Sequence, residues 1–149
     1  MPDANLDQGF GFLLNDVSRL LRHEFERRVR GFGLTRPQWI LLSHLARHPG
    51  STLAELADWV QQEKITVSRQ VTRLEKGGWL HRRDPANDGK SHGLKLTPQG
   101  GAMIVRLAKV ANELRDDALA VLETGRREAL LHDLSLVRAN LERMGGAGG

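Results

Sequence analysis

Basic and hydroxyl side chains gather on one face of a helix that the sequence predicts at residues 64–76. On a helical wheel that advances roughly 100° per residue, Arg69, Arg73 and Thr66 lie opposite the apolar Val67. Arginine can donate two hydrogen bonds to one guanine, and threonine can bond to either kind of base. Such a face suits the edges of DNA bases, although a merely solvated basic helix would show the same pattern. The residues of this helix that we expect to contact DNA are Lys64, Ile65, Thr66, Arg69, Arg73 and Lys76.

The positive charge of the chain is concentrated around the same helix. The 149 residues carry 22 Lys+Arg and 18 Asp+Glu, a formal net charge of +4. Between residues 63 and 95 the basic residues outnumber the acidic ones by four, which equals the surplus of the whole chain. The remaining segments are therefore neutral on balance. A local positive potential of this kind attracts an anionic partner.

Composition and motifs exclude several other classes of protein. The chain has no cysteine, which excludes disulfides, thiolate nucleophiles and thiolate zinc sites. No apolar run approaches the roughly 18–20 residues of a membrane-spanning helix, and the polar N-terminus is not a secretory signal. Common hydrolase, zinc-protease and phosphate-loop motifs are absent from the sequence, and the neighbouring Ser43 and His44 point apart on a helix. We therefore predict a cytoplasmic protein that is not an enzyme and uses no cofactor.

Periodicity and capping residues predict the helices that precede the basic one. Apolar residues at intervals of three and four predict an amphipathic helix at residues 10–30. A second helix should begin after Thr35 as its N-cap and end before Pro49. Thr52 and Glu55 have the spacing of a capping box, which opens a third, short helix. A short polar turn then leads into the helix at 64–76.

A hairpin is predicted directly after the basic helix. The glycine pair Gly77-Gly78 should end that helix. Residues 79–83 and 93–97 alternate apolar and polar side chains, which predicts two strands. The segment between them is rich in turn residues and carries Lys90, so it should form a long, basic-tipped loop.

The last third of the chain predicts two more helices, at residues 98–122 and 125–143. Together with the helix at 10–30, they carry more apolar surface than a small lobe can cover, which predicts an interleaved homodimer. We expect one domain over residues 1–149, with a flexible tail at 144–149.

A short capped helix, a turn, a basic-faced helix and a basic hairpin are the components of a winged helix-turn-helix. The predicted fold class is α+β and mainly α-helical, with this lobe at residues 35–97 and dimerisation helices at 10–30 and 98–143. The basic helix would enter the major groove of double-stranded DNA, and the hairpin tip would lie along the adjacent minor groove. An interaction module that uses these helices without DNA is the alternative, and it predicts no salt-sensitive binding to duplex.

The sequence resembles the MarR family of bacterial transcriptional regulators, and within it the SlyA-like members. The resemblance extends from about residue 10 to 143. It is carried by GLTRPQW at 33–39, LAELADWV at 53–60, TVSRQVTRLEKGGWLHRR at 66–83 and DPANDGKSHGLKLTPQG at 84–100. The last two strings are the most specific, because they combine a recognition helix ending in L-E-x-x-G with a wing that leads to L-T-x-x-G.

The resemblance implies an obligate homodimer that binds a pseudo-palindromic operator, usually as a repressor. Matched by position, the base-contacting residues of the family fall on Ile65, Thr66 and Arg69. The wing motif Asp-x-Arg falls on Asp88 and Lys90, so lysine replaces an arginine that would read the shape of the minor groove. Other predicted DNA contacts are Lys64, Arg73, Lys76 and Arg83.

The resemblance also implies a small aromatic or phenolic effector. We expect its pocket at Trp39, with Arg19 or His23 as the partner of an anionic group. Trp39 could equally be a residue of the hydrophobic core, since it lies on an apolar helix face.

His44 and His48 are four residues apart on one helix, a spacing that lets two imidazoles share a metal ion. His23, Glu24 and Glu26 could complete such a site. The simpler interpretation, which we favour, is that these are surface residues and that no metal is bound, with the charge of His48 suited to a helix C-terminus.

Overall fold

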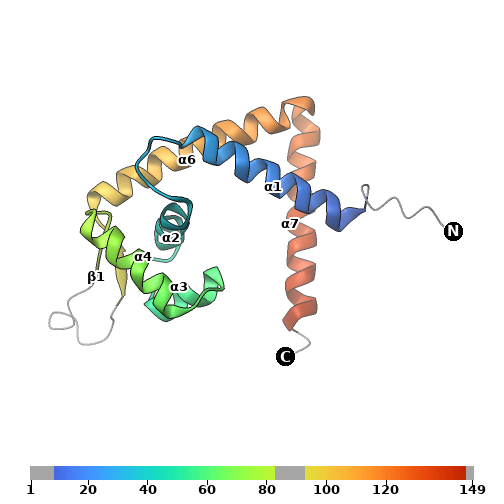
Figure 1. Ribbon diagram of the computed structural model, residues 1–149. Coiled ribbons are helices and arrows are strands. Elements are labelled where there is room, and N and C mark those ends of the chain that lie inside the picture. Colours follow the sequence, from blue (N-terminus) through green and yellow to red (C-terminus); the bar gives the residue numbers. More distant parts are fainter. Residues whose placement is uncertain (1–8, 83–92, 147–149) are drawn as a thin grey trace. The chain divides into compact units, whose positions relative to one another are not determined.

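The computed structural model describes residues 9–82 and 93–146, and it is mainly helical with one small sheet (Figure 1). The contacts divide the chain into two units, Met1–Ala111 and Asn112–Gly149, with the boundary inside one helix. The predicted fold class is confirmed. The elements are α1 (Phe10–Arg28), α2 (Arg36–Arg47), α3 (Leu53–Val60), α4 (Lys64–Lys76), β1 (Leu80–Arg82), β2 (Leu94–Leu96), α6 (Pro98–Ala118), the 3-10 helix η2 (Leu119–Val121) and α7 (Thr124–Gly146).

Local hydrogen bonds explain where α2 and α3 begin. Thr35 is the N-cap of α2, and its backbone N–H donates to Oε1 of Gln38 at 3.0 Å. Thr52 is the N-cap of α3, and its Oγ1 accepts from the backbone N–H of Glu55 at 3.1 Å. The Thr52 hydroxyl lies 3.3 Å from the Glu55 carboxylate, so these two side chains also bond to each other. Both predicted caps are confirmed, because each satisfies backbone groups that a helix start leaves unpaired.

The turn between α3 and α4 is set by one residue in a left-handed conformation. Gln61 has a φ of 55°, and its N–H donates to the carbonyl oxygens at the end of α3. The chain then enters α4 at Lys64, as predicted. A tight turn of this kind between two short helices is what defines a helix-turn-helix.

The lobe formed by α2, α3, α4 and the sheet has its own hydrophobic core. α4 contributes Val67, Val71 and Leu74, which are at most 1% exposed. Burial of this stripe orients α4, because the opposite face must then point outward. The buried cluster consists of Leu41, Leu42, Leu45, Leu56, Ala57, Val67, Val71, Leu74, Leu80 and Leu94.

The two strands pair in antiparallel fashion, with Leu80 opposite Leu96 and Arg82 opposite Leu94. Leu94 also bonds to the segment before α3, because its N–H donates to Ser51 O at 2.9 Å and its carbonyl accepts from Gly50 N–H at 3.0 Å. A side chain at Gly93 would come within 2.5 Å of the Gly50 carbonyl oxygen, so only glycine fits there.

The start of α6 is joined to the end of α4. The Thr97 hydroxyl donates to the carbonyl oxygen of Gly78 and accepts from the N–H of Gly100 at 3.0 Å. A Cβ on Gly100 would lie 2.0 Å from the carbonyl oxygen of Trp79. The predicted helix start at Thr97 is therefore confirmed, and the glycine three residues later is required by this close approach.

The end of the chain differs from the sequence-based prediction in two places. α6 ends at Ala118 and continues as a 3-10 turn, before α7 begins at Thr124. α7 runs to Gly146, so Met144–Gly146, which we expected in a flexible tail, are helical. Glycine weakens a helix without forbidding it, and a long helix can extend through a final turn that contains two glycines.

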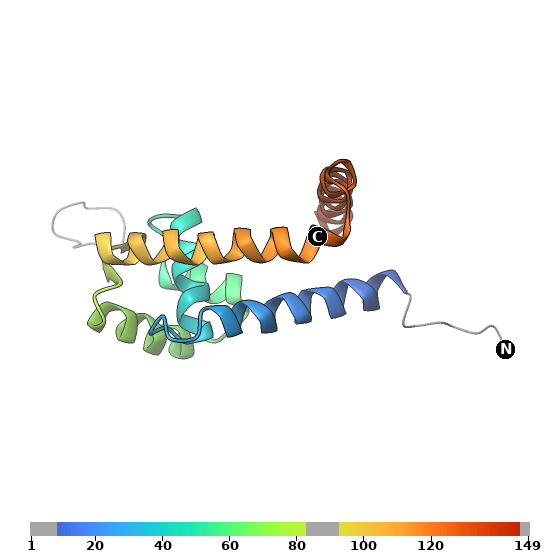
Figure 2. The same ribbon diagram turned by 90° about the horizontal axis from the view of Figure 1, so that it is seen from above.

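Helices α1 and α7 have no buried residue. Figure 2 shows the C-terminal end of α1 beside the lobe, where Phe25 meets Trp39 of α2 edge to face at a centroid distance of 4.8 Å. The rest of α1 leaves its apolar side chains uncovered. The exposed apolar residues of the two helices are Phe10, Phe12, Leu13, Leu14, Val17, Leu20 and Leu21 in α1, and Leu130, Leu131, Leu136, Leu141 and Met144 in α7.

Candidate nucleic-acid interface

The outward face of α4 carries the side chains that the sequence predicted there. Ile65 is 59% exposed, and Thr66, Arg69, Arg73 and Lys76 are all exposed. Lys64, at the first turn, is exposed as well. In the part of the chain that the structure describes, no ion pair holds Arg69 or Arg73, so their guanidinium groups are available to an external anion.

An acidic residue of α4 at the edge of this face is paired with the adjacent strand. The Glu75 carboxylate accepts from the backbone N–H of Arg82 at 3.3 Å, and it lies 3.7 Å from Nε of the same residue. The other arm of the Arg82 guanidinium reaches Oγ1 of Thr72 at 3.5 Å. We did not predict this contact. The spacing of Thr72 and Glu75 on one helix edge was the available signal, but the turn after α4 had to be known to place Arg82.

The predicted wing contacts Arg83, Asp88 and Lys90 lie outside the described residues. They belong to residues 83–92, which begin directly after β1 and end before β2.

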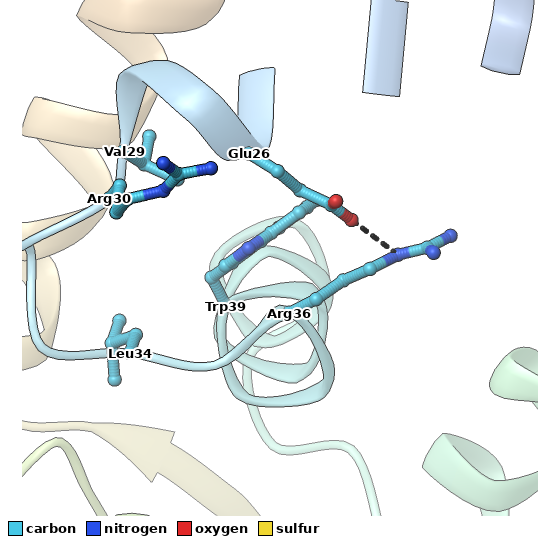
Figure 3. Close-up of a pocket in the computed structure, with 6 residues that line it drawn as sticks. All are labelled: Glu26, Val29, Arg30, Leu34, Arg36 and Trp39. Carbon is cyan, nitrogen blue, oxygen red and sulfur yellow. Dashed lines mark ion pairs between the residues drawn. The ribbon is translucent and has the colours of Figure 1, made fainter. Parts of the chain in front are cut away.

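A second candidate site is a pocket of about 310 Å³ between the end of α1 and the start of α2 (Figure 3). Trp39 forms one wall, and two cationic side chains, Arg30 and Arg36, stand on either side of it. The carboxylate of Glu26 forms an ion pair with Nε of Arg36 at 3.3 Å. The lining residues are Glu26, Val29, Arg30, Leu34, Arg36 and Trp39.

The structure does not bring Arg19 or His23 to this pocket. Both are exposed on α1, and Arg19 lies 3.6 Å from the Asp16 carboxylate. They precede Glu26 and Arg30 by seven residues each, about two helical turns. Glu26 and Arg30 line the pocket instead, and a contact of Arg19 or His23 with an effector stays a prediction. Arg30 and Arg36 were missed, because they flank the turn whose path the sequence does not specify.

The histidine pair of α2 needs a correction, because His44 is buried and not on the surface. It is 6% exposed, and its ring lies 4.7 Å from that of His48 and 4.3 Å from Trp59 of α3. Nδ1 of His44 has no hydrogen-bond partner in the described chain. Burial, together with the neighbouring His48 and Arg47, lowers the pKa of His44, while Glu55 opposes the shift. His48 is exposed and ends α2, as predicted.

The other residues considered for a metal site have different partners. Glu24 accepts hydrogen bonds from Arg27 and Arg28, which lower the pKa of its carboxyl to about 2. Glu26 is paired with Arg36. Over residues 9–82 and 93–146, no three histidine, aspartate or glutamate side chains come together as metal ligands.

None of the helices that the structure describes is both long enough and apolar enough to cross a membrane. The buried stripe of α4, the turn at Gln61 and the sheet that follows define a winged helix-turn-helix protein.

Comparisons with known proteins give the family. A MarR family profile matches residues 32–91. The HTH-type transcriptional repressor Rv2887 of Mycobacterium tuberculosis is 30% identical over 116 residues, which cover 78% of this chain and 84% of the relative. The crystal structure of transcriptional regulator PA3341 has 34% identity and a TM-score of 0.74, covering 91% of this chain and 99% of that one. A structure of Rv2887 in complex with DNA has a TM-score of 0.75 at 27% identity, covering 88% and 98%.

The chain therefore belongs to the MarR family of transcriptional regulators. Its mainly helical fold with a two-stranded sheet matches that of the solved structures. Membership of the SlyA-like subgroup stays a prediction.

Proposed function

We propose that this chain is a homodimeric repressor that binds a pseudo-palindromic DNA operator through α4 and responds to a small aromatic acid. The exposed cationic face of α4, opposite a fully buried stripe, carries the proposal. Arg69 donates to a base edge, Thr66 and Ile65 contact neighbouring bases, and Lys64, Arg73 and Lys76 neutralise phosphates. The relative Rv2887 is a repressor and has been crystallised with DNA, which supports this assignment.

The homodimer follows from the apolar side chains of α1 and α7. Leu20, Leu136 and Leu141 are more than half exposed in the isolated chain, which is costly for rows of leucine in water. A second copy would cover these rows. Twofold symmetry then presents two α4 helices to two half-sites, which is why the operator should be a pseudo-palindrome.

The test is selection of bound duplexes from fragmented genomic DNA with the purified protein, followed by affinity measurement over a range of salt. We expect one inverted repeat to be enriched and its affinity to fall steeply as salt rises. Duplex binding that is absent, or that does not depend on salt, would support an interaction module without DNA.

The pocket at Trp39 is the proposed effector site. The indole offers a face for an aromatic ring, and Arg30 and Arg36 offer cations for a carboxylate. Structures of Rv2887 with salicylic acid and with p-aminosalicylic acid support this ligand class. The ligand would compete with Glu26 for Arg36, and its binding would favour a conformation with lower operator affinity.

Titration with salicylate, followed by tryptophan fluorescence, tests the pocket. Trp39→Phe should remove most of the response, whereas Trp59→Phe, which changes an exposed residue outside the pocket, should keep it. An equal response in both variants would place the ligand elsewhere.

The proposed activity needs no catalytic step, and the relatives are transcriptional regulators. The assignment that we propose is thus that of a regulator and not of an enzyme. Because its partner is the DNA of the cell, it acts in the cytoplasm.

A further inference from the structure

Glu75 is an acid in an unfavourable place for a DNA-binding helix. It lies one turn after Thr72 on the edge of α4, beside the cationic face that ends with Lys76. Its side chain is 40% exposed, so its charge is not hidden from an approaching phosphate. An unpaired carboxylate there would repel DNA of any sequence. Its presence suggests a role that outweighs this repulsion.

The contacts between Arg82 and Glu75 indicate what that role is. Glu75 receives the backbone N–H of Arg82 at 3.3 Å and stands 3.7 Å from its Nε, while Nη2 reaches Thr72 at 3.5 Å. The main chain and the side chain of Arg82 in β1 thus contact two residues of α4, Glu75 and Thr72. Exposed ion pairs add little to the stability of a fold. The contacts of Arg82 with Glu75 and with Thr72 nevertheless restrict the orientation of α4 relative to β1.

The strand end that Arg82 occupies is also tied to the core. Arg82 pairs with Leu94, which is 2% exposed and bonds to Gly50 and Ser51. The last residue of β1 is therefore fixed to the core on one side and to the edge of α4 on the other.

We propose that Glu75 and Arg82 are positioning residues that fix the orientation of α4 relative to the sheet, and so determine how well α4 discriminates its operator from other DNA. This inference rests on the proposed function, in which α4 reads the operator. Neither residue needs to touch a base. The pair acts through the placement of Ile65, Thr66 and Arg69.

Glu75→Gln gives the decisive test, because the two mechanisms predict different ratios of operator affinity to random-duplex affinity. If charge alone matters, removal of an acid near DNA tightens binding to every duplex. If the pair positions α4, the ratio of operator affinity to random-duplex affinity falls by about three- to tenfold, within the range of coupling between contacting residues. Glu63→Gln is the matched control. It removes an exposed acid at the N-cap of α4 that makes no capping hydrogen bond, so it should tighten both duplexes alike.

The charge exchange Glu75→Arg with Arg82→Glu should recover part of the lost ratio, because it restores the side-chain ion pair but leaves no acceptor at position 75 for the backbone N–H of residue 82. Arg82→Gln should lower the ratio without changing the slope of affinity against salt, because Arg82 is not a phosphate contact in this proposal. Thermal unfolding of all variants should stay close to wild type, as expected for an exposed pair.

If Glu75→Gln behaves like Glu63→Gln, or if Arg82→Gln reduces the salt slope and the exchange restores nothing, the positioning role is wrong. A wild type that does not discriminate any operator would overturn the proposed function, and this inference with it. A discriminating wild type whose ratio is unchanged in Glu75→Gln would overturn this inference alone.

Discussion

Leucine residues are buried in one region of this molecule and exposed in another. In the winged helix-turn-helix lobe, Leu42 and Leu56 are completely buried. In the long helices, Leu20 of α1 and Leu136 of α7 are each 57% exposed. The lobe thus completes its core within one chain, whereas the long helices do not. The lobe therefore needs no second chain to complete its core, whereas we expect a partner chain to cover the long helices.

The largest effect on operator affinity should come from a charge placed among the exposed apolar residues of α1. Leu20→Glu places a charge in the apolar row of α1 and should dissociate the dimer, since a buried unpaired carboxylate is strongly unfavourable. Loss of the second half-site should weaken operator binding by roughly 10²–10⁴-fold, the usual gain from linking two sites. Light scattering should report about twice 16.6 kDa for wild type and about 16.6 kDa for the variant. Leu20→Met is the control, and a monomeric variant that keeps full operator affinity would contradict the comparison.

A smaller effect is expected from weakening the lobe itself. Leu42→Ala leaves a cavity in a fully buried position and should cost about 2–5 kcal/mol of unfolding free energy. The loss should not depend on protein concentration, because no partner chain is needed to bury Leu42. Leu20→Ala should instead lose more stability on dilution. Denaturant unfolding at two protein concentrations separates the regions, and equal behaviour of the two variants would show that they are not independent.

Arg69→Ala should leave both regions folded and change only base reading. The expected loss is about 1–3 kcal/mol per half-site, with relaxed selectivity at one symmetric base pair. Arg126→Ala, in α7 and away from α4, serves as the control for loss of charge. Affinities for the operator and its single-base variants provide the measurement. A uniform loss on all sequences would make Arg69 a phosphate contact.

The smallest effect concerns acid sensitivity of the lobe. The pKa of His44 is lowered from 6.5 by burial and by His48 and Arg47, so the unfolded chain takes up a proton at a higher pH than the folded one. Stability should therefore be full above about pH 6.5 and fall as the pH drops below it. His44→Phe keeps a ring against Trp59 and should flatten this dependence, measured by thermal unfolding between pH 5 and 8. His132→Phe changes an exposed position in α7 and should leave the pH dependence of stability unchanged. If His44→Phe also left the pH dependence unchanged, burial of His44 would not be its cause.

Local signals in the sequence were sufficient to predict α4 and insufficient to predict the contacts around it. The bounds of α4 follow from the polar turn before it and the glycines after it, and its outward face follows from the period of Val67, Val71 and Leu74. These signals lie within one or two turns of chain. The ion pair of Glu75 with Arg82 depends on how the chain reverses after α4, which no spacing specifies.

The same limit explains the pocket and the buried histidine. Arg30 follows the end of α1 and Arg36 begins α2, and the turn between the two helices brings both to the pocket at Trp39, so their shared site is a tertiary property. His44 is buried because α3 places Trp59 over it, whereas in the sequence it is one polar residue on an amphipathic helix. The periodicity of the sequence predicted which face of each helix is apolar. The residues that cover that face could be identified only from the folded structure.

The bonds of Thr97 to Gly78 and Gly100 have a mechanical consequence. They hold the C-terminal end of α4 at the start of α6. Any change in the orientation of α4 would therefore be a rotation about that end, and it would move the N-terminal end of the helix the most. A helix of 13 residues is about 20 Å long. Rotation by about 10° about the fastened end would therefore displace Ile65 and Thr66, at the far end, by about 3 Å, which is the length of one hydrogen bond.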